Sequence, residues 1–213
     1  MVEEENTHTM KHIFNKILMY LLVPVVLMAF SSCSHGDTPK VNHLAKADGQ
    51  KVAEAYANGD WETIVSICDT LMDDEDTMNL VIPYAEALAA VGNPQKGLYL
   101  LDKKLSSNPT DYYLYQTKGN VYYSMGKFDS AIISYEKVIS MRPSFARAYM
   151  NVGETYELIG NKDKAIANFL AAAQLFVDND YIKEASVYAE KVLRLDSANR
   201  EAKELQRQIL SIK

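Results

Sequence analysis

The side chains that most often carry out nucleophilic and metal chemistry are concentrated at one end of this chain. All four histidines lie within the first 43 residues, and there are two cysteines, Cys33 and Cys68. From residue 44 onward a Ser-His-Asp or Cys-His nucleophile system cannot be assembled, because each needs an imidazole as general base. A zinc site built from Cys and His ligands is excluded there for the same reason. We therefore expect no catalytic residue, no metal and no cofactor.

An acidic run at residues 73–76, Asp-Asp-Glu-Asp, is the remaining candidate for a cation site. It lacks the alternating ligand positions and the glycine of an EF-hand loop. The residue types favour a solvated turn in which Asp76 or Thr77 caps the following helix. Cys68 has no cation near it in the sequence, so we interpret it as a small buried residue and not as a reactive thiol.

The overall composition is that of a globular protein. Of the 213 residues 48% are apolar and 23% charged, and the formal net charge is −6. A general binder of nucleic acid needs a basic face to neutralise phosphates, and no basic stripe is present. Nucleic acid is therefore not an expected partner.

The first forty residues have the layout of an export signal. Lys11 and Lys16 precede an apolar run at residues 17–30, which is followed by Ser31, Ser32 and Cys33. A basic segment, a short apolar segment and small residues in this order are typical of a secretory signal peptide. The run is shorter than the roughly 20 residues of an ordinary membrane span. Translation starting at Met10 would give the usual basic beginning, because residues 1–9 carry three glutamates.

The junction Phe30-Ser31-Ser32-Cys33 resembles the lipobox of bacterial lipoproteins. This resemblance implies cleavage before Cys33 and acylation of that cysteine, with 1–32 as signal peptide and 33–43 as a polar, lipidated tether. It also implies a location in the bacterial cell envelope, expected at the outer membrane, on either its periplasmic or its surface face. A plain signal peptide and an uncleaved anchor are the alternatives.

The remainder of the chain repeats itself every 34 residues. Gly92, Gly126 and Gly160 have this spacing, and five further columns share it, among them Ala85, Gly119 and Gly153, then Gly97, Ala131 and Ala165, then Leu101, Tyr135 and Phe169. A fixed period of this length indicates an array of small structural units. Apolar and small residues recur at i, i+4 and i+7 on both sides of each separating glycine, which predicts two helices per unit. We expect Gly119 to face Ala131, so that the two backbones approach closely.

These columns resemble the tetratricopeptide repeat, which has the same period and the same order of residue types. The resemblance implies an all-α fold, a right-handed superhelical solenoid of helix-turn-helix repeats, over residues 44–213. We place repeats at about 45–77, 78–111, 112–145 and 146–179, with capping helices at 180–213. The phase breaks after Phe176, so helix 163–177 is expected to serve two pairs, and the last helix to cover Val187 and Leu193 as a cap.

One face of the first helix in each repeat is not used by these columns. In the family this face lines a concave groove, and it carries Tyr113, Gln116, Asn120 and Tyr123 in one repeat, then Arg147, Met150, Asn151 and Glu154 in the next. Asn120 and Asn151 match asparagines that hold a terminal carboxylate in chaperone-binding members, but Gln116 replaces a lysine. We expect Asn120 and Asn151 to bind the backbone of a partner, and Tyr113, Tyr123 and Met150 to supply apolar contact.

The resulting hypothesis is an envelope-anchored lipoprotein that acts as a protein-protein interaction scaffold and not as an enzyme. It would bind a peptide or helix of a protein partner in its groove, in the assembly of an outer-membrane or envelope complex. Two alternatives stay open at this point: a hydrolase that uses carboxylates, and a purely structural envelope component.

Overall fold

The computed structural model describes residues 46–71 and 80–212, and in these ranges every regular element is an α-helix. The chain divides into two compact units, Met1–Asp76 and Thr77–Lys213. The predicted signal peptide, Cys33 with its tether, and the acidic run at 73–76 lie outside the described residues.

The first unit contains one helical pair, α2 (Lys46–Asn58) and α3 (Trp61–Thr70). The chain turns at Gly59, which has a φ of +68°, and the carboxylate of Asp60 then accepts a hydrogen bond of 3.1 Å from the Thr63 backbone N–H. Cys68 is fully buried, as the sequence interpretation expected. Burial, together with the negative charge of Asp69, raises the pKa of its thiol to about 12, so the group is an inert apolar filler at neutral pH.

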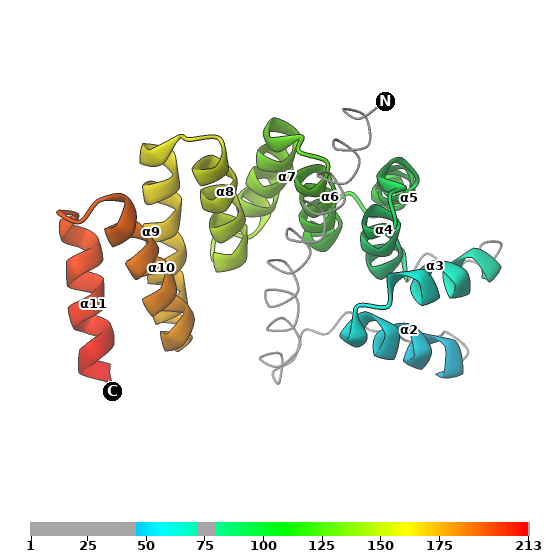
Figure 1. Cartoon of the computed structure of the whole chain (residues 1–213), viewed down its shortest axis with the longest axis horizontal. Helices are drawn as coiled ribbons and strands as arrows, with labels where there is room; N and C mark the ends of the chain where they lie inside the picture. Colours follow the sequence, from blue (N-terminus) through cyan, green and yellow to red (C-terminus); the bar gives the residue numbers. More distant parts are fainter. Residues whose placement is uncertain (1–45, 72–79, 213) are drawn as a thin grey trace, which may run out of the picture. The chain divides into compact units, whose positions relative to one another are not determined.

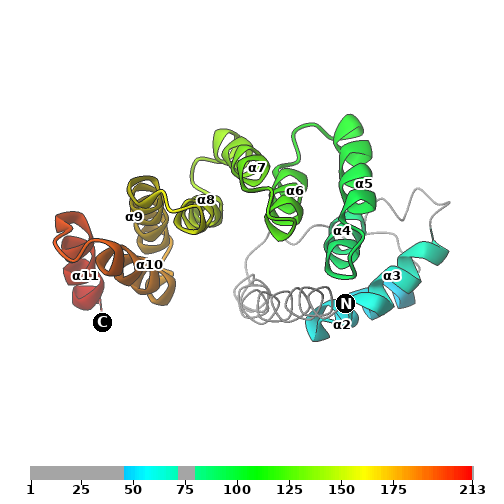
Figure 2. The same ribbon diagram turned by 45° about the horizontal axis from the view of Figure 1, so that its top comes forward.

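The second unit is a row of helices in which each packs on its neighbours in sequence. Figures 1 and 2 show the same order in two views, from α4 to α11. The elements are α4 (Val81–Ala90), α5 (Pro94–Ser107), α6 (Tyr112–Ser124), α7 (Phe128–Met141), α8 (Ala146–Leu158), α9 (Lys162–Asp178), α10 (Ile182–Leu195) and α11 (Arg200–Ile212). This is the array of helical pairs that the 34-residue period predicts.

The turn within each pair depends on one residue in the left-handed region. Gly126 and Gly160 have φ values of +70° and +77°, a conformation that costs a residue with a Cβ roughly 1–2 kcal/mol. Asp180 adopts the same conformation, with a φ of +63°, between α9 and α10. The chain therefore makes the same turn there without a glycine, which is why the spacing of glycines does not reveal it.

The helix α9 belongs to two pairs, as the break in phase predicts. It packs against α8 on one side and against α10 on the other, and it also contacts α11. One continuous core joins these helices, built around fully buried Phe169, Ala173, Ala189 and Val192. The buried alanines of α9, at 165, 172 and 173, let the neighbouring helices approach it closely from both sides.

The glycines at 119 and 153 make room for a ring, and the expectation that Gly119 opposes Ala131 is wrong. A Cβ placed on Gly119 would overlap the ring of Tyr135, and one on Gly153 would lie 2.6 Å from the ring of Phe169. These are separations that van der Waals repulsion forbids. The ring of the second helix thus lies directly against the backbone of the first.

The preceding pair solves the same packing problem with the residues exchanged. Ala85 stands in the glycine column and Leu101 in the ring column, while Gly97 replaces the alanine of the second helix. A Cβ on Gly97 would lie 2.9 Å from the backbone oxygen of Ala85. The close approach has moved along the helix, which explains why this repeat matches the sequence pattern poorly.

The last helix covers the end of the core with one apolar side. Ala202, Leu205 and Ile209 are buried in the same core as α9 and α10, whereas the charged side chains at 203, 204 and 207 are exposed. Leu193 is partly buried against this core, as expected.

The expectation that α11 covers Val187 is wrong, because this side chain is 51% exposed with α11 in place. Val187 stands two positions from both Ala185 and Ala189, which places it about 200° around the helix axis from these buried residues. It therefore lies on the side of α10 that faces away from the core.

Replacing Gly153 with alanine is expected to lower the free energy of unfolding by about 1–3 kcal/mol, because the new methyl group overlaps the fully buried ring of Phe169. Urea denaturation followed by circular dichroism measures the change. Adding Phe169→Leu reproduces the pair Ala85 and Leu101, so it should recover part of the loss. If Gly153→Ala were as stable as the unmodified chain, the ring would not need the glycine, since alanine otherwise favours a helix by about 1 kcal/mol.

Candidate functional site

A ladder of polar side chains follows the first helices of the array and has the period of the repeat. Glu86 on α4, Asn120 on α6, Glu154 on α8 and Tyr188 on α10 are successive members of one 34-residue column. Asn120 Nδ2 donates to Glu86 at 3.1 Å, and the Tyr188 hydroxyl donates to Glu154 at 3.3 Å. We call the surface formed by Glu86, Gln116, Asn120, Tyr123, Glu154 and Glu157 the first-helix face.

The orientation of the Asn120 carboxamide is fixed by its neighbours. Its Nδ2 donates to the carboxylate of Glu86, which can only accept. Its Oδ1 accepts from the Tyr135 hydroxyl at 3.0 Å and, more weakly, from Gln116 Nε2 at 3.4 Å. Both lone pairs of Oδ1 are thus engaged, and Asn120 keeps one N–H for a further acceptor.

This orientation leaves the carbonyl oxygen of Gln116 without a partner. Because Asn120 presents an acceptor, Gln116 has to turn its Nε2 toward it. Its Oε1 is then buried with no hydrogen bond, in a side chain that is 8% exposed. A buried acceptor without a donor costs roughly 1–3 kcal/mol of stability.

Glu154 is held by two groups from α10. Lys191 Nζ donates to its Oε1 at 2.6 Å, and the Tyr188 hydroxyl donates to the same oxygen. The Lys191 ammonium also lies 5.0 Å above the ring of Phe169. The contacts leave Oε2 of Glu154 with its acceptor capacity.

The tyrosine hydroxyls on this face lie in a negative field. Burial raises the pKa of Tyr123 to about 12, and the carboxylates of Glu154 and Glu157 add to the effect. Burial likewise raises the pKa of Tyr135 and of Tyr188, with a further contribution from Glu154 in each case. All three phenols therefore stay protonated at physiological pH and can serve as neutral hydrogen-bonding groups.

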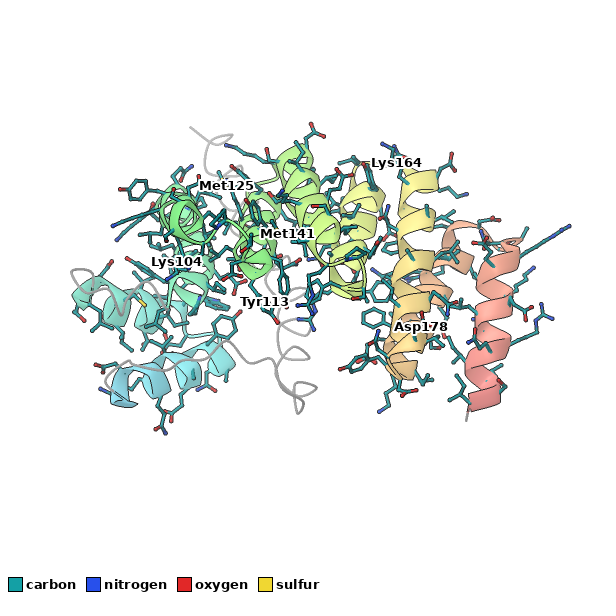
Figure 3. All side chains as sticks on the ribbon, turned by 180° about the vertical axis from the view of Figure 1, so that it is seen from behind. Lys104, Tyr113, Met125, Met141, Lys164 and Asp178 are labelled. Atoms are coloured by element: carbon teal, nitrogen blue, oxygen red, sulfur yellow. The ribbon has the colours of Figure 1, made fainter. Side chains whose placement is uncertain are left out.

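The other residues expected to line a groove have different degrees of access. Arg147, Asn151 and Tyr113 are half-buried, and Figure 3 shows Tyr113 at the start of α6. Tyr113 packs on Tyr112 with ring centroids 4.1 Å apart and on Phe145 at 6.4 Å. Met150 is only 5% exposed and belongs to the core with Phe169, so it cannot supply the apolar contact expected of it.

Neither a metal centre nor a membrane span is found among the described residues. No group of three or more His, Cys, Asp or Glu side chains in 46–71 and 80–212 could hold a metal ion. No helix in these same ranges is both long and apolar enough to cross a bilayer.

Comparison with known families identifies the repeats. A family model described as TPR repeat matches residues 119–160, and one described as tetratricopeptide repeat matches residues 146–179. The chain is a tetratricopeptide repeat protein. The matches identify repeats of a scaffold type and no catalytic domain. A search of curated protein sequences gave no significant match.

Solved tetratricopeptide repeat structures share the fold. The crystal structure of MamA superposes with a TM-score of 0.57 at 17% identity, over 75% of this chain and 92% of that one. The thermophilic TPR protein TTC0263 of Thermus thermophilus gives 0.53 at 17% identity, over 78% and 97%. SycD, a type III secretion translocator chaperone of Yersinia enterocolitica, gives 0.50 at 18% identity, over 57% and 85%. These likenesses confirm the expected fold class.

Sequence analysis missed four members of the first-helix face and its surroundings: Glu86, Glu157, Tyr188 and Lys191. The period contained a signal for two of them, because Glu86 and Tyr188 stand 34 residues from Asn120 and Glu154. Lys191 gives no such signal, since its contact with Glu154 exists only because α9 is shared between two pairs.

Gln116→Met is expected to leave the tetratricopeptide array as stable as before, or more stable by up to about 2 kcal/mol. The change removes an unpartnered buried oxygen, and Met150 shows that methionine fits the same position one repeat later. Thr155→Val is the control, because the Thr155 hydroxyl does have a partner, the Asn151 carbonyl at 2.6 Å, and its loss should destabilise. A decrease for Gln116→Met beyond about 1 kcal/mol in urea unfolding would contradict the assignment.

Proposed function

We propose that this tetratricopeptide repeat protein is a lipoprotein of the bacterial cell envelope that binds a segment of a partner protein on its first-helix face. It acts as a scaffold in the assembly of an envelope complex, at the outer membrane, and it is not an enzyme.

The anchor rests on the sequence between Met10 and Cys33. A basic beginning, a short apolar run and two serines before a cysteine fit processing and acylation at Cys33. Each buried methylene of an acyl chain contributes about 0.8 kcal/mol, so two or more chains give durable attachment where one does not. The polar residues 34–43 would then hold the repeats away from the bilayer surface.

The binding role rests on one observation, the unused bonding capacity of the first-helix face. A face that served only packing would satisfy its polar groups internally. Here Gln116 Oε1 has no partner, Glu154 retains one oxygen, and Asn120 retains one N–H. Tyr113 and Tyr123 add half-buried rings, the type of side chain that contributes most to protein interfaces.

A terminal carboxylate is a poor candidate for the bound group. Asn120, which would have to donate to it, already donates to Glu86 at 3.1 Å, and Glu154 and Glu157 add negative charge beside Tyr123. Repulsion between like charges would oppose a second carboxylate here. The face favours a partner segment that brings hydrogen-bond donors.

Cys33→Ala is expected to move the mature protein from the membrane fraction to the soluble fraction, or to leave an unprocessed precursor, because the acylated thiol would be lost. Fractionation followed by mass spectrometry of the N-terminus measures both outcomes. Cys68→Ala is the matched control and should stay in the membrane fraction, since Cys68 is buried in the fold. Unchanged membrane partition and normal cleavage of the Cys33 variant would reject the lipoprotein proposal.

Partner capture is expected to depend on the half-buried polar residues of the same helices. Arg147→Ala combined with Asn151→Ala should weaken binding about tenfold in a pull-down from detergent-solubilised membranes, because each lost contact contributes about 0.5–1.5 kcal/mol. Lys137→Ala, an exposed change on α7, serves as the control for surface charge. Equal recovery of the partner by both variants, with helical content intact, would place the binding surface elsewhere.

A further inference from the structure

Acceptors outnumber donors on the first-helix face. The carbonyl of Gln116 is buried without a partner. Tyr188 and Lys191 both donate to Oε1 of Glu154, which leaves Oε2 available. The carboxylate of Glu157 enters no ion pair or hydrogen bond with any residue in the described ranges. Against these acceptors stands one remaining N–H of Asn120.

Gln116 belongs to the same cluster as these carboxylates. It bonds to Asn120, whose Oδ1 also accepts from Tyr135 and whose Nδ2 donates to Glu86. The negative charges of Glu154 and Glu86 both act on the Tyr135 hydroxyl, which places them around this point. The orphaned oxygen thus lies where only an incoming group could bring it a donor.

Glu157 is not explained by the stability of its own helix. It lies in the last turn of α8, Ala146–Leu158, where the helix dipole disfavours a negative charge by about 0.3–1 kcal/mol. It is exposed and has no basic residue in that turn to compensate it. Its charge acts instead on Tyr123 of the neighbouring α6.

The cations near this face do not neutralise that end of it. Lys191 is engaged with Glu154 at 2.6 Å. Arg147 lies in the first turn of α8 and acts on Tyr188, ten residues before Glu157, or about 15 Å along the helix axis. The excess of negative charge is therefore at the Tyr123 and Glu157 end.

We propose that Gln116, Tyr123 and Glu157 form a binding site for a lysine or arginine side chain carried by the partner segment. The inference rests on the proposed function of this face and specifies what the face recognises. An ammonium group has three donors and a guanidinium five, and neither has an acceptor, which complements a cluster of unpaired oxygens. Glu157 supplies the opposite charge, and the half-buried ring of Tyr123 supplies a surface for the side chain's methylenes and its cation.

The test begins with selection of displayed random peptides against the full chain, purified in detergent. We expect the recovered peptides to be enriched in lysine or arginine. A selected peptide, labelled with fluorescein, is then titrated by fluorescence anisotropy against the unmodified chain and its variants.

Glu157→Gln should weaken binding of that peptide about three- to tenfold while the melting temperature stays equal or rises slightly, since the dipole clash is removed. Glu136→Gln on α7 is the matched control, because it removes the same charge from an exposed position away from this face. Replacing the peptide's basic residue with glutamine should cause the same loss, and the two changes together should not add, because both remove one contact. Gln116→Met should weaken binding without lowering stability.

The outcomes separate this site from the proposed function. Basic peptides that bind Glu157→Gln and Glu136→Gln equally would overturn the site and indicate attraction to the overall charge of −6. Peptides without basic enrichment that lose affinity in the Arg147 and Asn151 variant would overturn the site and leave the proposed function standing. Recovery of no peptide above background would overturn both.

Discussion

The contact on which the second unit depends is that of an aromatic ring with the backbone of a glycine on the preceding helix. The ring of Tyr135 fills the space beside Gly119, and the ring of Phe169 fills the space beside Gly153, with no room for even a methyl group in either case. Helices held this closely bury their apolar sides almost completely, as the exposures of Ala131 and Phe169 show. Because each helix also packs on the following pair, the contact fixes the array and not just one hairpin.

The same contact decides the arrangement of the polar ladder. Tyr135 lies against Gly119, and its hydroxyl ends 3.0 Å from the side-chain carbonyl of Asn120, the residue after that glycine. Phe169 has no hydroxyl, so the equivalent residue Glu154 is reached from α10 by Tyr188 and Lys191 instead. One missing oxygen in the ring column thus changes the partners of the first-helix face from one repeat to the next. This difference leaves the negative charge unevenly distributed over α6 and α8.

The end of the array shows how a repeat can continue without its sequence signature. Asp180 takes the left-handed conformation that glycine has in the other turns, and α9 supplies a packing surface to α8 and α10 alike. A second helix is therefore added without a new first helix, and the charged side of α11 ends the row. The alanines of α9 allow this, because a helix with larger side chains could not be approached closely from two sides.

The sequence by itself determined the helical repeat, its period, the double role of α9 and the face that packing leaves unused, because all of these depend on the spacing of side chains along one helix. It also placed Gln116, Asn120, Tyr123 and Glu154 together. Only the tertiary structure decided which of these groups have partners, since the bonds of Asn120 to Glu86 and of Glu154 to Lys191 join residues 34 and 37 positions apart. It also buried Met150 and left Gln116 Oε1 without a donor. Whether a polar atom is satisfied depends on angles and distances between neighbouring helices, and spacing within one helix does not contain them.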